Sequence, residues 1–74
     1  MKSISVLYPI EDHDNKFKCL LNKYKNKNIS IHKLSHHYFI MIQLLTDDET
    51  DIIFNEFSIC KPTSITVNND KLYL

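Results

Sequence analysis

The chain is 74 residues long and contains no glycine, alanine, arginine or tryptophan. The absence of glycine excludes the glycine-rich loops that bind phosphate groups in P-loop and dinucleotide-binding proteins. The absence of arginine excludes the planar, two-pronged hydrogen bonding with which proteins hold a phosphate or read guanine. The sequence thus lacks the motifs of the commonest nucleotide-binding classes, and it predicts a protein without a cofactor.

Cysteines and long apolar runs are also scarce. Cys19 and Cys60 are too few for a disulfide framework, and their spacing matches no zinc motif. The longest apolar run, Tyr38 to Leu45, is far shorter than the roughly 20 residues that span a bilayer. Glu11 and Asp12 follow the short apolar start too closely for a signal peptide. We therefore expect a reduced, cytoplasmic protein.

The length predicts a single domain over residues 1–74. A domain of this size buries only about 60% of the surface of its unfolded chain, so contact with a second chain would stabilise it. Lysines and acids balance at nine each, which does not favour a nonspecific binder of polyanions. Lysine, asparagine and isoleucine have AT-rich codons, whereas the missing residue types have mostly GC-rich ones. The composition therefore predicts an AT-rich genome, such as that of a phage, a mobile element or a low-GC bacterium.

The charges are segregated along the chain. Six lysines and no acid lie between Lys16 and Lys33, a segment that we call the lysine block. Five acids and no lysine lie between Asp47 and Glu56, the acidic block. Both blocks overlay amphipathic helical patterns. If the two helices lie antiparallel, the lysine-rich end of the first is beside the acidic start of the second, and one open interpretation is that the blocks only neutralise each other.

The hydrophobic periodicity predicts an α+β fold with the element order β-α-β-β-α-β. This is the ferredoxin-like, or split βαβ, arrangement, in which two antiparallel helices cover one face of an antiparallel sheet. Thr46 to Glu49 form a capping box that begins the second helix, and Asn26 or Asn28 is expected to end the first in a left-handed conformation. The predicted strands cover residues 3–8, 29–34, 38–45 and 65–67, and residues 72–74 form either a terminal extension or a short fifth strand. The predicted helices include residues 17–24 and 47–57.

The second face of the sheet is the first candidate site. The strand from Tyr38 to Leu45 is apolar on both faces, so one of its two sets of side chains lies away from the helices. If Ile40 and Ile42 face the core, Phe39 and Met41 lie on the other face with Leu7, and exposed apolar patches usually mark an interface. Alternatively, residues 71–74 cover this face, or the helices pack on the odd-numbered set.

The start of the second helix is the second candidate. Asp47, Asp48, Glu49 and Asp51 form a compact negative cluster with which a small protein can occupy the nucleic-acid channel of a larger one. The competing interpretation is a solvated helix start, because acids in the first turn favour the helix dipole. As an alternative function, the lysine-rich helix binds nucleic acid directly, although we do not expect this. That alternative relies on Lys16, Lys18, Lys23, Lys25 and Lys27.

Metal binding, catalysis and RNA binding are weaker hypotheses. His13, His36, His37 and Cys60, with Cys19, include ligand types that hold zinc, although no spacing supports a site and we predict none. Asp12 and His13 follow the first strand, where the chain resembles ferredoxin-like metal-dependent nucleases. No nucleophile accompanies them, so we predict no enzyme. Tyr8, Tyr38 and Phe39 occupy strands on which the similar RNA-recognition domains carry stacking rings.

In its size and its single cofactor-free domain, the chain resembles phage anti-defence proteins, anti-CRISPR proteins among them, and toxin-immunity proteins. The resemblance implies a non-enzymatic inhibitor that blocks a site on another protein sterically. It implies neither a membrane partner nor a bound cofactor. A homodimer through the second face of the sheet is a further expectation.

Overall fold

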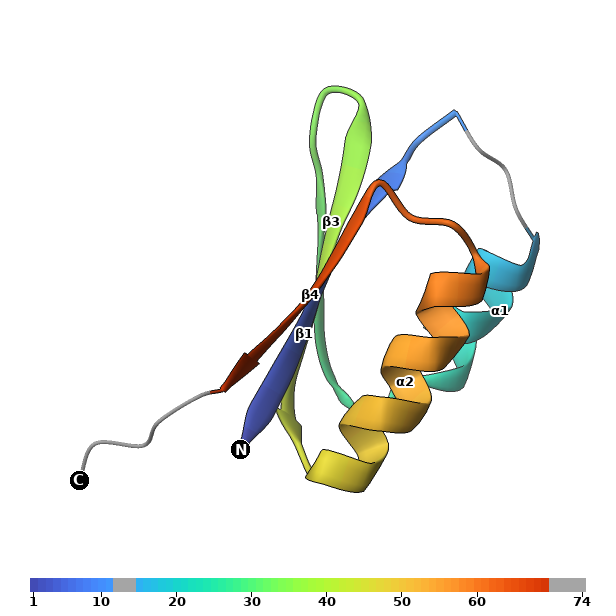
Figure 1. Ribbon diagram of the computed structural model, residues 1–74. Coiled ribbons are helices and arrows are strands. Elements are labelled where there is room, and N and C mark those ends of the chain that lie inside the picture. Colours follow the sequence, from blue (N-terminus) through green and yellow to red (C-terminus); the bar gives the residue numbers. More distant parts are fainter. Residues whose placement is uncertain (12–14, 70–74) are drawn as a thin grey trace.

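The computed structural model describes residues 1–11 and 15–69 and confirms the predicted α+β class. Asp12, His13 and residues 72–74 lie outside the described residues. The elements follow one another as two helices interleaved with four strands (Figure 1). They are β1 (Lys2–Pro9), α1 (Asn15–Lys23), β2 (Asn28–Lys33), β3 (His37–Leu45), α2 (Asp47–Ile59) and β4 (Ser64–Asn69).

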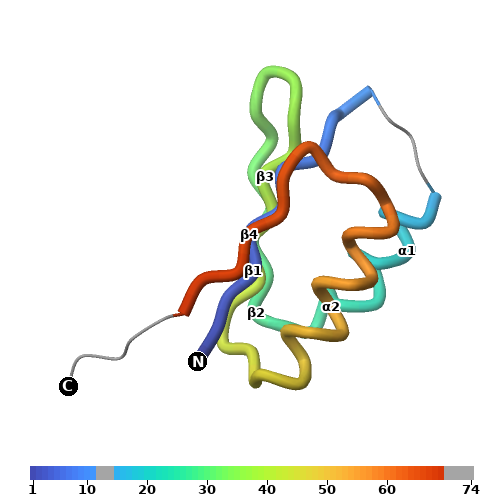
Figure 2. Tube along the Cα trace, viewed as in Figure 1, coloured from blue at the N-terminus to red at the C-terminus, as the bar shows by residue number. Residues whose placement is uncertain are grey.

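The four strands form one antiparallel sheet in the order β2-β3-β1-β4. Both helices lie on the same side of this sheet and run in opposite directions, and the Cα trace shows the same two layers (Figures 1 and 2). The two long strands β1 and β3 are central, and the shorter β2 and β4 are the edges. In the described part of the chain, no helix covers the opposite side of the sheet.

The alternation of side chains along β1 and β3 decides which face is the core. Ile4 and Val6 of β1 and Ile40 and Ile42 of β3 have no exposed surface, and the register pairs Ile4 with Ile42 and Val6 with Ile40. Because successive residues of a strand point to opposite faces, these four side chains lie together under the helices. The structure thus decides between the two alternatives left open by the sequence: the even-numbered set of β3 forms the core at Ile40 and Ile42.

The alternation of β3 breaks at its end. The register advances from Ile4–Ile42 to Lys2–Leu45, so β3 has one more residue than β1 in this interval. Such a bulge shifts the facing of every later side chain. Leu44 is 56% exposed and has φ of 61°, whereas Leu45 is 1% exposed. Strict alternation along the whole strand predicts that Leu44 points to the same face as Ile40 and Ile42. This prediction is wrong, because the bulge turns Leu45 toward the core and leaves Leu44 exposed.

The helices begin and end for identifiable reasons. Thr46 caps α2, and its capping box is complete: the Thr46 hydroxyl accepts from the amide of Glu49 at 3.2 Å, and the Glu49 carboxylate accepts from the amide of Thr46 at 3.1 Å. Beyond the cap at Cys60, Lys61 takes the left-handed conformation with φ of 54°. The predicted left-handed stop at Asn26 or Asn28 is wrong, because among the described residues positive φ occurs at Leu44 and Lys61.

Aromatic side chains fill the space between the helices and the sheet. Tyr8 stacks on Phe17 of α1 with ring centroids 3.7 Å apart, and Phe57 of α2 meets Phe17 edge-on at 6.1 Å. All three are buried. Tyr8 is therefore a core residue and cannot stack on a nucleic-acid base, so the suggested RNA-binding platform is wrong at this position.

Candidate functional site

The uncovered face of the sheet, which we call the open sheet face, has an apolar centre. Leu7 pairs directly with Phe39 across the two central strands, and Ser5 pairs with Met41. Leu7, Phe39 and Met41 are all half-buried, because neighbouring strands cover their flanks but nothing in the described chain covers their tips. The structure thus brings together the three apolar residues that the sequence predicted for this face.

Polar, uncharged residues surround this centre. The register places Ser30 and His32 of β2 beside Met41 and Phe39. On the other side it places Ser64 and Thr66 of β4 beside Leu7 and Ser5. At the far end, the side-chain amide of Asn68 donates to the Ser5 hydroxyl at 3.4 Å. The described positions that point to this face are Ser3, Ser5, Leu7, Pro9, Asn28, Ser30, His32, His37, Phe39, Met41, Gln43, Ser64, Thr66 and Asn68.

None of these described positions is a lysine, an aspartate or a glutamate. An apolar centre with few charges, inside a polar rim, is the composition of the centre of a protein–protein interface. A surface that binds a nucleic-acid backbone would instead need cations to neutralise phosphates. The open sheet face therefore suits a protein partner.

The acidic cluster at the start of α2 is partly neutralised within the chain. The Lys2 ammonium lies 3.2 Å from the Asp47 carboxylate, and Lys27 forms an ion pair with Glu49. The hydrogen bond from Lys27 is the main reason why the pKa of Glu49 is lowered. Asp48 and Asp51 are exposed and form no ion pair with a described residue. The expected contact between the lysine-rich end of α1 and the start of α2 is confirmed.

A second cross-helix cluster joins α1 to the middle of α2. The Lys23 ammonium donates to both oxygens of Glu56 at 3.0 and 3.1 Å, and the Tyr24 hydroxyl donates to the same carboxylate at 2.7 Å. Burial would raise the pKa of Glu56, but these hydrogen bonds outweigh it and the pKa is lowered. Burial, followed by the bond to Glu56, raises the pKa of Tyr24. The hydrogen bond to Glu56 raises the pKa of Lys23.

The lysine block is consequently less available to nucleic acid than its sequence indicates. Lys23 and Lys27 are engaged by Glu56 and Glu49. Lys16, Lys18 and Lys25 are exposed. Two of the five lysines of the nucleic-acid alternative are therefore used to hold α1 against α2.

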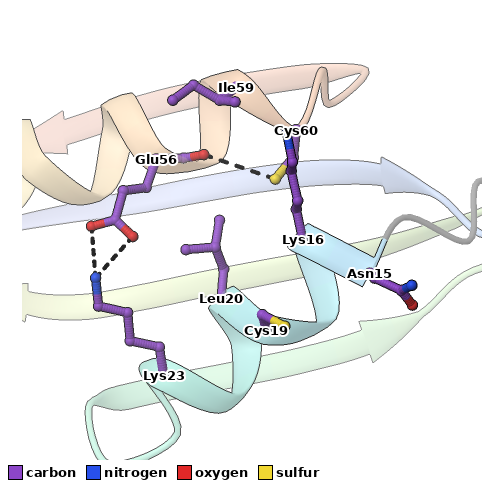
Figure 3. Close-up of a pocket in the computed structure, with 8 residues that line it drawn as sticks. All are labelled: Asn15, Lys16, Cys19, Leu20, Lys23, Glu56, Ile59 and Cys60. Carbon is purple, nitrogen blue, oxygen red and sulfur yellow. Dashed lines mark hydrogen bonds and ion pairs between the residues drawn. The ribbon is translucent and has the colours of Figure 1, made fainter.

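An open pocket of about 420 Å³ lies between the helices at the N-terminal end of α1 (Figure 3). Its walls are almost entirely apolar atoms, and its lining is Asn15, Lys16, Cys19, Leu20, Lys23, Glu56, Ile59 and Cys60. Ile59 is 66% exposed, and the buried Cys60 thiol donates to the Glu56 carbonyl at 3.8 Å. This pocket was not predicted from the sequence, although the spacing of Ile52 and Ile59 could have indicated an apolar stripe on the outer side of the helix.

No metal centre is assembled from the described residues: they contain no group of three histidine, cysteine, aspartate or glutamate side chains that could hold an ion. His36 lies in the turn before β3, His37 begins β3, and Cys60 caps α2. Cys19 and Cys60 are both free thiols. His13 and Asp12, named as candidates for a metal or a catalytic role, lie outside the described residues.

Among the described residues, no helix is long and apolar enough to cross a membrane. In comparisons with protein-family models, with curated proteins and with solved structures, the chain matches none of them.

Proposed function

We propose that this chain is a small non-enzymatic inhibitor that binds another protein through its open sheet face and blocks a site on that protein sterically. The observation that carries the proposal is the position of Leu7, Phe39 and Met41 at the centre of a face that no described residue covers and whose described strand positions include no lysine, aspartate or glutamate. An exposed contiguous apolar patch usually marks an interaction site. Its polar rim supplies hydroxyl and amide groups that can hydrogen bond to a partner backbone.

The biological role within this proposal is anti-defence, of the anti-CRISPR kind, in a phage or mobile element. The small size and an amino-acid composition typical of AT-rich genomes support it. A toxin-immunity protein is the alternative that the same features support. In both roles the chain acts by occupying a surface, so no catalytic residue is required.

The proposal includes the ferredoxin-like arrangement as the scaffold. The element order, the central position of β1 and β3, and the placement of both helices on one side support this assignment. In such a scaffold the sheet is rigid, since every central strand is paired on both sides. A rigid apolar face loses little conformational entropy when a partner binds.

The test is an affinity capture from lysate of the native host with three forms of the chain. Met41→Asp places a charge at the centre of the open sheet face, and Asn22→Asp places one on the exposed surface of α1 as the matched control. We expect one protein to be captured stoichiometrically by the wild type and by Asn22→Asp, and to be lost with Met41→Asp. The purified partner should lose activity when the wild-type chain is added.

Circular dichroism shows whether Met41→Asp remains folded, and Phe39→Ser is a milder substitution at the same face. Capture of nucleic acid in place of protein would contradict the proposal. Equal capture by the wild type and by a folded Met41→Asp variant would also contradict it, because the partner would then bind elsewhere.

A further inference from the structure

The outer side of α2 carries two exposed isoleucines. Ile52 is 57% exposed and Ile59 is 66% exposed, whereas Ile53 and Phe57 on the inner side are buried. Seven residues correspond to almost two complete helical turns and a rise of about 10 Å, so Ile52 and Ile59 lie in one line along the helix. A helix that only packs on its own sheet has no need of apolar residues on its solvent side.

We propose that this line is a contact between two copies of the chain, in which α2 of one copy packs antiparallel on α2 of the other about a two-fold axis near Asn55. In an antiparallel pair centred there, Ile52 of each copy lies opposite Ile59 of its partner. A two-fold contact uses the same patch on both copies and must be self-complementary. The spacing of the two isoleucines meets this condition.

The pocket between the helices fits the same arrangement. Ile59 forms one wall of this pocket, and Leu20 of α1 forms another (Figure 3). In the antiparallel pair, Ile52 of the second copy arrives beside Ile59 and therefore at the pocket. Its volume of about 420 Å³ has ample room for an isoleucine side chain. Burying such a side chain removes apolar surface from water, and the two-fold axis provides this contact twice.

The placement of charge along α2 favours a second copy in the antiparallel orientation. The exposed Asp48 and Asp51 lie near the start of α2, and the exposed Lys61 follows its end. Lys16 also lines the pocket at that end. An antiparallel pair brings the acids of each copy to Lys61 of the other, whereas a parallel pair would place acid against acid. The net charge of zero adds no overall repulsion between copies.

This contact is independent of the proposed inhibitor function. The helices and the open sheet face lie on opposite sides of the sheet (Figure 1). A dimer through α2 would leave Leu7, Phe39 and Met41 of both copies exposed and pointing away from each other. The homodimer expected from the sequence uses the sheet face, whereas the proposed contact uses the helix face.

The test is a charge exchange between two variants, followed by sedimentation velocity in reducing buffer. One variant carries Asp48→Lys and Asp51→Lys, and the other carries Lys61→Glu. Each alone sets like charges together, and we expect its dimer to dissociate roughly tenfold more readily than that of the wild type. A one-to-one mixture restores both attractive contacts, so it should form a heterodimer about as tight as the wild-type dimer.

Lys33→Glu, a charge reversal at the end of β2, is the matched control and should dimerise like the wild type. A wild-type chain that is monomeric at every concentration would overturn the inference. A dimer that survives both charge variants but is lost in a folded Met41→Asp variant would also overturn it, because the sheet face would then be the dimer contact. Reducing buffer prevents the exposed Cys19 from linking copies covalently.

Discussion

At the scale of single residues, a chain without glycine must use residues that carry a Cβ atom at every position where the backbone adopts a positive φ. Leu44 at the bulge and Lys61 after α2 occupy this region, with φ of 61° and 54°. For a residue with a Cβ, this conformation costs roughly 1–2 kcal/mol. At Lys61 the following Pro62 has no amide hydrogen, so the second hydrogen bond of a Schellman cap cannot form. The amide of Lys61 still donates to the Ser58 carbonyl at 3.1 Å.

Leu44 gives the cleaner measurement of this strain. Its side chain is 56% exposed and contributes little to the core. We expect Leu44→Gly to raise the free energy of unfolding by about 0.5–1 kcal/mol. Glycine adopts positive φ without strain, which stabilises the folded state. The greater conformational entropy of glycine in the unfolded chain offsets part of this stabilisation. Urea titration measures the change. Leu44→Ala keeps the Cβ and should leave stability within roughly 0.5 kcal/mol of the wild type, and a glycine variant less stable than this control would contradict the argument.

At the scale of the elements, one carboxylate holds the two helices together. Glu56 of α2 accepts from Lys23, the last residue of α1, and from Tyr24, which directly follows it. The folded-state pKa of Glu56 is lowered from its ordinary value of 4.5. Its contribution to stability is therefore complete above the unfolded-state pKa and is lost as the pH falls through the folded-state pKa. Glu49, paired with Lys27, acts in the same direction.

We expect Glu56→Gln to flatten the loss of stability below about pH 4.5, where the wild type loses this carboxylate. At neutral pH the variant should be less stable by about 1 kcal/mol, because the glutamine amide accepts more weakly than a carboxylate. Urea titrations between about pH 3 and about pH 7, at a protein concentration that keeps the chain monomeric, give both values. Glu11→Gln removes an exposed carboxylate as the control. An unchanged acid dependence in Glu56→Gln would show that the cluster does not hold the helices.

The same elements show what a sequence can and cannot predict. The capping box at Thr46 was predictable, because its two partners are three residues apart and the interaction is local. The facing of Phe39 and Met41 was predictable from alternation. The bulge at Leu44 was not, since leucine is an unusual residue for positive φ. The bond from Tyr24 to Glu56 and the pocket beside Ile59 depend on how the helices lie together, which periodicity within one helix does not specify.

At the scale of the whole molecule, the chain has two apolar surfaces on opposite sides. Met41 marks the open sheet face, and Ile52 marks the outer face of α2. A domain of this size is marginally stable by itself, so binding of another chain at either surface would stabilise the fold. Because the two faces are separated by the sheet, a dimer through α2 presents two open sheet faces outward. Such a dimer can engage two partner sites at once, which increases avidity without new contacts.

The dependence of thermal stability on concentration distinguishes the two surfaces without knowledge of the partner. A chain that dimerises in its folded state melts at a higher temperature when it is more concentrated, by mass action. A tenfold increase should raise the melting temperature of the wild type by on the order of 4 °C, since each protomer of a dimer gains about 0.7 kcal/mol. A folded Met41→Asp variant should show the same rise, because the open sheet face takes no part in the dimer. The Asp48→Lys and Asp51→Lys double variant should melt at nearly the same temperature over that range, because repulsion from Lys61 opposes its assembly. If the rise instead disappears in Met41→Asp and persists in the double variant, the open sheet face joins the copies and the outer face of α2 is the surface left for a different protein.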